Sequence, residues 1–255
     1  MTDLGTYVYA VGRNLDDPGV SGISGAGDST VRLISARGLT AVVSSVDLAE
    51  FGEAALRRNL EDLTWVERTA RRHDEVVRQS AAAAGALAPF RLVTIYRSDD
   101  VVRDRIDEMY DELTLALDRI ERRSEWSVKA FSKDDAPPAE VAATGAPESG
   151  AAYLQRRRAE IRRRNDATDS QRMRADQLFW DLTAAASATR RLAPQDRRLS
   201  GREQPMVLNG SFLIDDDRTG EFLDLVDRLR DSYPGLDVEV NGPWPAYSFA
   251  VLDAT

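Results

Sequence analysis

The longest periodic pattern in the sequence lies between residues 56 and 81. Apolar or weakly polar residues recur there at steps of three or four: Leu56, Leu60, Leu63, Val66, Ala70, His73, Val77 and Ala81. This spacing predicts one face of an amphipathic helix about seven turns long, with a break near Asp62. Gly85 and Pro89 are expected to end it. A helix with one apolar face must bury that face against another layer, so the chain is expected to fold in layers.

Segments typical of β-strands surround this helix. TYVYAVG (6–12) and LAPFRLVTIYR (87–97) read as strands, and residues 30–46 read as a hairpin that turns at Arg37-Gly38. A second helix follows Ser98, which can cap it. Its apolar stripe is Val102, Ile106, Met109, Leu113, Leu117 and Ile120. The mixture of strands and helices without regular alternation indicates the α+β class.

The second half of the chain predicts a further domain. It runs strand (125–132), a Pro- and Gly-rich linker (134–150), a mostly helical segment (151–192), strand or hairpin arm (206–214), helix and strand (236–240). This order fits a ferredoxin-like sandwich whose first crossover is enlarged by a helical insertion at about 151–192. We therefore expect two domains, 1–123 and 124–255.

Charge is distributed unevenly along the chain. The net charge is −9, yet residues 156–198 contain twelve arginines and only six acidic residues. An acidic body with one basic segment is not typical of a general nucleic-acid-binding protein. No apolar run reaches the roughly 18–20 residues that span a bilayer, and the N-terminus lacks the basic region of a signal peptide. We expect a protein of the cytoplasm that does not enter a membrane.

Residues that carry chemistry are sparse. The sequence has no cysteine and one histidine, His73, whose place beside the apolar stripe favours a packed, hydrogen-bonded role. GISGAGDS (22–29) lacks the G-K-[ST] ending of a phosphate-binding loop, and the acidic run 215–217 lacks the spacing of a calcium loop. We expect no catalytic residue, metal or cofactor, and hence no enzyme.

The most basic stretch is YLQRRRAEIRRR (153–164). On a helix, Arg157 and Arg158 share a side with Ile161. Three interpretations are open: a solvated helix with salt bridges, a surface for an acidic protein partner, or a nucleic-acid contact. The third is weakened because no aromatic residues are interleaved for base stacking. Arg157, Arg158 and Arg162 are the candidate partner-binding residues here.

The segment NGPWPAYSF (241–249) places Trp244 between two prolines. Proline lacks an amide hydrogen and extends the residue before it, so the segment should be extended and weakly paired. One interpretation is a clasp that seals the second domain. The other is an exposed aromatic platform for a partner, with Trp244 and Tyr247 as contact residues.

The same segment carries a family resemblance. GPWPAYSF resembles the GPWPPYSF-like terminus of the gas vesicle protein F/L family (GvpF/GvpL), with Ala246 where proline is common. Further similar stretches follow the family's order over nearly the whole chain: TYVYAVGR (6–13), LEDLTWVERTARRHDEVV (60–77), PFRLVTIYRSDD (89–100), EWSVK (125–129), GAAYLQRR (150–157) and LNGSFLID (208–215).

The resemblance implies an accessory protein of gas vesicle formation. It implies two α+β domains, the second ferredoxin-like and enlarged by helices. It also implies contact with the hydrophobic shell protein (GvpA) and with other accessory proteins, at the gas vesicle and during assembly, without catalytic residues or cofactors. The leading hypothesis is therefore an assembly or nucleation factor. A small-molecule sensor remains the alternative, because ferredoxin-like domains can bind ligands at helix–sheet clefts.

Overall fold

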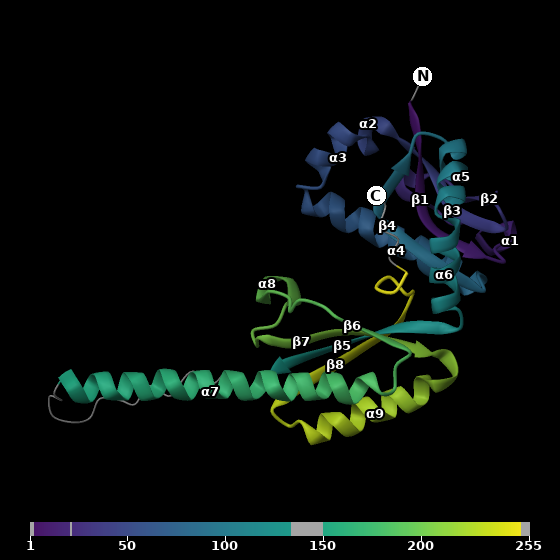
Figure 1. Ribbon diagram of the computed structural model, residues 1–255. Helices are drawn as coiled ribbons and strands as arrows, with labels where there is room; N and C mark the ends of the chain where they lie inside the picture. Colours follow the sequence, from purple (N-terminus) through teal and green to yellow (C-terminus); the bar gives the residue numbers. More distant parts are fainter. Residues whose placement is uncertain (1–2, 21, 134–149, 251–255) are drawn as a thin grey trace. The chain divides into compact units, whose positions relative to one another are not determined.

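The computed structural model describes residues 3–20, 22–133 and 150–250, and the chain separates into two compact units (Figure 1). The first unit combines the chain up to Glu125 with the residues from Pro243 onward, and the second spans Trp126–Gly242. The α+β class is confirmed. The expected domains, 1–123 and 124–255, stay a prediction, but residues 243–250 group with the first unit rather than with the second half of the chain.

A four-stranded sheet organises the first unit. Its strands pair antiparallel in the order β2-β3-β1-β4. Their bounds are β1 Leu4–Arg13, β2 Arg32–Ala36, β3 Leu39–Asp47 and β4 Ala86–Tyr96. The predicted hairpin is confirmed: Arg37 and Gly38 both adopt positive φ, 49° and 79°, as a tight turn between twisted strands requires.

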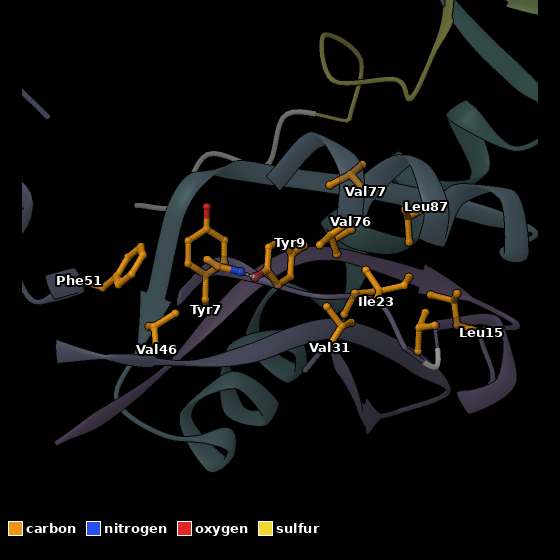
Figure 2. Close-up of a cluster of buried hydrophobic side chains, with 14 of the residues drawn as sticks. Tyr7, Tyr9, Leu15, Ile23, Val31, Val46, Phe51, Val76, Val77 and Leu87 are labelled. Carbon is orange, nitrogen blue, oxygen red and sulfur yellow. Dashed lines mark hydrogen bonds between the residues drawn. The ribbon is translucent and has the colours of Figure 1, made fainter. Parts of the chain in front are cut away.

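Strand β1 is buried on both faces. Tyr7 and Tyr9 belong to one cluster, and their rings stack with centroids 4.6 Å apart. They pack with Val76 and Val77 of helix α4, Leu63–Ala83 (Figure 2). Val8 faces the other side, toward Val102 and Ile106. A bulge between Val8 and Ala10 shifts the register. This burial on both faces explains the nearly continuous apolar run in the sequence.

Helices flank the sheet of the first unit. They are α1 Asp17–Val20, α2 Leu48–Phe51, α3 Glu53–Asn59, α4 Leu63–Ala83, α5 Asp99–Glu108 and α6 Tyr110–Ile120, with a 3₁₀ turn η1 at Ala26–Asp28. The stripe predicted for α5 and α6 is confirmed, since all six of its residues are buried.

The stripe predicted for residues 56–81 is only partly right. The break at Asp62 is confirmed, because its carboxylate accepts hydrogen bonds from the amides of Thr64 and Trp65 and starts α4. Leu60 and Leu63 are exposed, however, at 48% and 82%. The cause is the break itself, since two separate helices do not share one continuous face.

A second four-stranded sheet, in the order β6-β7-β5-β8, carries the other unit. Its strands are β5 Arg123–Ser132, β6 Ala188–Arg191, β7 Met206–Asp215 and β8 Leu236–Trp244. The helices are α7 Gly150–Thr183, α8 Arg197–Ser200 and α9 Thr219–Ser232, with a 3₁₀ turn η2 at Asp216–Arg218. α7 and α9 cover one face of this sheet and enclose Leu178, Phe212 and Phe222 (Figure 1).

The predicted helical insertion at about 151–192 is wrong at its end. The helix stops at Thr183, and Ala188–Arg191 forms β6, which pairs antiparallel with β7. The sequence Ala-Thr-Arg-Arg has no apolar alternation, so only its partner strand makes it a strand. The predicted linker lies outside the described residues, except for Gly150, where α7 begins.

α7 is far longer than the sheet needs. It has 34 residues, so it extends about 51 Å. Among the side chains of α7 that the structure describes, the buried ones all lie in its C-terminal part: Gln171, Ala175, Leu178, Phe179 and Leu182. The N-terminal part extends beyond the ends of the strands (Figure 1). The helix is continuous through residues 165–170.

Candidate functional site

The described residues 153–163 of α7, called the basic arm below, are mostly exposed to solvent. Arg157, Arg158 and Arg162 are all exposed. Arg157 forms one ion pair along the helix, with Nη1 3.7 Å from Oε2 of Glu160. An exposed pair of this kind contributes little to stability, about 0.3–0.5 kcal/mol. The arginines are therefore available to a partner at low cost.

Apolar residues of the arm are exposed as well. Leu154 and Ile161 are 56% and 51% exposed. They are seven residues apart and share one side of the helix with Arg157 and Arg158, at i, i+3, i+4 and i+7. The arm thus presents a small apolar surface bordered by guanidinium groups, which suits a partner that is apolar and acidic.

The C-terminal segment packs within the first unit, so the clasp predicted for the second domain is in the wrong place. Tyr247 is partly buried against the Tyr7–Tyr9 cluster, and its hydroxyl lies 3.4 Å from Oδ1 of Asp74. Burial raises the pKa of Tyr247, and the Asp74 carboxylate adds to the effect. The cause of the misplacement is a long-range contact that no local pattern signals.

Glu125 also holds the C-terminal segment in place. Its two carboxylate oxygens accept hydrogen bonds from the backbone amide of Ser248 at 2.7 Å and from the Ser248 hydroxyl at 2.6 Å. Ala246 and Phe249 are buried, whereas Trp244 remains 40% exposed. The structure therefore assigns clasp contacts to Tyr247 and its neighbours and leaves part of the Trp244 ring accessible.

His73 is confirmed as a packed, hydrogen-bonded histidine. It is 4% exposed, and its Nδ1 lies 3.0 Å from the Tyr7 hydroxyl, which also accepts a hydrogen bond from the amide of Val93. Burial lowers the pKa of His73 from 6.5 to about 4. The imidazole is therefore neutral at physiological pH.

A polar cleft of about 280 Å³ lies beside the Gly-rich loop in the first unit. Residues 25–28 form one wall, Glu50 and Phe51 of α2 form another, and Arg68, Thr69 and Arg72 of α4 form the third. Both arginines lie near acids: Arg68 is 3.8 Å from Glu50, and Arg72 is 3.7 Å from Asp28 and 3.1 Å from Glu75. The loop leads into strand β2 and not into a helix.

A comparison with protein families decides what this chain is related to. The model of the family described as gas vesicle synthesis protein GvpL/GvpF matches residues 5–251. The chain belongs to the GvpL/GvpF family. This match confirms the resemblance noted in the sequence. It also supports a role for the protein in gas vesicle formation.

Relatives of this GvpL/GvpF chain match it over nearly its whole length. Gas vesicle protein L of Streptomyces sp. (strain CB03234) is 40% identical over 98% of this chain and 94% of its own. Gas vesicle protein F of the same strain is 27% identical, over 96% and 99%. The crystal structure of GvpF from Anabaena sp. PCC7120 aligns with a TM-score of 0.69 at 19% identity, over 98% of this chain and 97% of that one. The fold is therefore shared with a solved family member.

The five predicted contact residues of this GvpL/GvpF protein form two candidate surfaces. Arg157, Arg158 and Arg162 lie on α7 in the second unit, and Trp244 and Tyr247 lie in the C-terminal segment of the first unit. Sequence reasoning missed two features, the exposure of Leu154 on the arm and the cleft. The i, i+4 spacing of Arg68 and Arg72 was the one available signal for the cleft. Among the described helices, none is long and apolar enough to cross a membrane.

Proposed function

We propose that this protein assists or nucleates gas vesicle assembly by binding the hydrophobic shell protein GvpA, at the gas vesicle and without catalysing a reaction. Membership of the GvpL/GvpF family supports a role in gas vesicle assembly. The basic arm supports binding to another protein as the way in which this role is carried out. The arm holds both apolar and charged side chains away from a folded core, as a contact surface for another protein would.

The physical task of such a factor is to cover apolar surface before it pairs wrongly. Exposed apolar patches and unpaired strand edges drive aggregation of small shell subunits. Leu154 and Ile161 supply apolar contact, while Arg157, Arg158 and Arg162 supply charge that orients an acidic partner. Other accessory proteins of the gas vesicle are partners of the same kind in this proposal.

The proposal includes a ferredoxin-like arrangement for the second unit. Apart from the short α8 and η2, its elements follow one another as β5, α7, β6, β7, α9 and β8, with both long helices on one face of the sheet. This is the βαββαβ order of that sandwich, with α7 as the enlarged first crossover. The enlargement is what creates the arm.

The arm is tested by pull-down of GvpA with the triple variant Arg157→Glu, Arg158→Glu, Arg162→Glu. We expect GvpA to be lost from the bound fraction. The matched control Arg57→Glu, Arg218→Glu, Arg228→Glu makes the same change in net charge at exposed positions on α3, η2 and α9, and should bind as the parent does. Equal binding by all three proteins would remove the arm from the proposal.

The C-terminal surface is tested separately. In the proposal Trp244 touches the partner, and Tyr247 holds the segment that presents it. Trp244→Ala should weaken GvpA binding with little change in melting temperature. A loss of melting temperature without a loss of binding would make Trp244 part of the clasp alone.

The cleft favours a second candidate function, binding of a small polar molecule by a sensor. It combines two guanidinium groups, two carboxylates and the Thr69 hydroxyl around a space large enough for a metabolite. Thermal-shift measurements against metabolite pools test it, because a specific ligand raises the melting temperature by mass action. The variant Arg68→Ala, Arg72→Ala should lose that shift. If no pool shifts the melting temperature, the sensor function is rejected and only the assembly function remains.

A further inference from the structure

The helices α5 and α6 expose a face that is opposite in charge to the basic arm. Residues 99–118 contain eight acidic residues and two arginines. Hydrogen bonds from Met109 N to Arg105 O and from Leu113 N to Met109 O carry the helical path across the junction between the two helices. The pair therefore acts as one rod, with its apolar stripe turned inward.

The outward side of this rod has both charge and apolar surface. Residues 101, 104, 108, 111, 112 and 115 fall on one side at helical spacing, opposite the buried stripe. We call them the acidic face: Val101, Asp104, Glu108, Asp111, Glu112 and Leu115. Val101 is 41% exposed and Leu115 is 65% exposed. The four acids of the face are also exposed.

The basic arm has the matching composition. Residues 153–163 contain five arginines and one glutamate. On the described part, Leu154 and Ile161 stand beside Arg157 and Arg158 at i, i+3, i+4 and i+7. The acidic face shows the same spacing at Glu108, Asp111, Glu112 and Leu115. Each surface thus places exposed aliphatic side chains among charges of one sign, and the two signs are opposite.

We propose that the basic arm of one copy of this protein packs against the acidic face of a second copy. Charge complementarity orients the two helical surfaces, and burial of an exposed aliphatic side chain of the arm, Leu154 or Ile161, against Leu115 adds apolar contact. The arm can reach a second molecule because Leu154 lies about 25 Å along the helix axis from Gln171, where burial begins. The occupant is a second copy because this chain itself carries the complementary surface.

The two surfaces differ, so the contact is heterologous. After one copy has bound another, one arm and one acidic face remain free. Such a contact adds further copies or closes into a reciprocal pair or a ring. The average mass should therefore rise above that of the monomer as protein concentration increases.

Sedimentation velocity of the full-length protein tests this self-association. At low salt, the mass should rise with concentration, and at about 1 M salt, where the screening length is about 3 Å, it should fall to that of the monomer. Arg157→Glu with Arg158→Glu should weaken association by at least about tenfold. The control Arg218→Glu with Arg228→Glu has the same net charge and should associate as the parent does. Circular dichroism confirms that each variant is folded.

Charge reversal on both sides makes the test specific. Asp111→Lys with Glu112→Lys should also yield a monomer, and the chain with all four reversals should associate again. A parent protein that stays monomeric at every concentration and salt overturns the proposal, as does a four-fold variant that remains monomeric while the parent associates. No GvpA is present, so the outcome is independent of the proposed function.

Discussion

The Tyr7 hydroxyl lies 3.0 Å from Nδ1 of His73, and both side chains are buried in the first unit. Burial holds the pKa of His73 at about 4, whereas the unfolded chain titrates near 6.5. As the pH falls from 6.5 to 4, the unfolded state binds a proton that the folded state does not. The free energy of unfolding should therefore decrease over this range, by up to about 3 kcal/mol, and then level off.

Chemical denaturation at a series of pH values measures this loss, and His73→Gln isolates it from the carboxylates that titrate nearby. The variant should have a flatter profile between pH 6.5 and 4. Parallel profiles for the two proteins would show that His73 does not carry the effect.

Substitutions in the C-terminal segment should separate its two aromatic residues. Tyr247→Ala removes a partly buried ring from the Tyr7–Tyr9 cluster, so it should lower the free energy of unfolding by about 1–2 kcal/mol. Trp244→Ala removes a ring that is 40% exposed and should cost less. Urea titrations of both variants give the comparison, and a larger loss for Trp244→Ala would contradict it.

Two glycines should respond to alanine in opposite directions. A Cβ at Gly25 would lie 2.6 Å from the Tyr9 hydroxyl and 2.8 Å from Ser44, so Gly25→Ala should destabilise the protein by about 1–3 kcal/mol. A Cβ at Gly220, in the first turn of α9, meets no atom within 4 Å. Gly220→Ala should be neutral or stabilise by up to about 1 kcal/mol. Thermal denaturation distinguishes the two, and a stable Gly25→Ala protein would mean that the loop can move away.

The Asp62 carboxylate caps α4 through the amides of Thr64 and Trp65, at 2.9 and 3.4 Å. Asp62→Ala should reduce stability by about 1 kcal/mol, because two amides lose their acceptor. Asp62→Asn keeps an acceptor oxygen, so this variant should retain most of the stability of the parent protein. Chemical denaturation followed by far-UV circular dichroism is the measurement, and equal losses in both variants would argue against a capping role.

Local patterns in the sequence predicted the elements whose stability is local. The hairpin at Arg37-Gly38 follows from turn chemistry, and the stripe on α5 and α6 follows from helical spacing and a core on one side. β6 could not be predicted, because Ala188–Arg191 is a strand only through its pairing with β7. Leu63 was misassigned because a capping residue one position earlier changes which face is buried.

The candidate site also has one part that local sequence patterns predict and another that they do not. Exposure of Arg157 and Arg158 follows from a sparse apolar content that cannot bury a wide stripe. The position of Tyr247 depends on Asp74, 173 residues earlier in the chain, and no local pattern specifies such a pairing. The cleft depends on three segments that meet only in the folded state.

The use of residues 243–250 by the first unit has a consequence for synthesis on the ribosome. Ser248 lies 123 residues after its partner Glu125, so it is made later. At ordinary elongation rates the delay is on the order of ten seconds. During that interval the nascent amino-terminal unit lacks the ring of Tyr247, so its Tyr7–Tyr9 cluster is left partly uncovered until residues 243–250 are made.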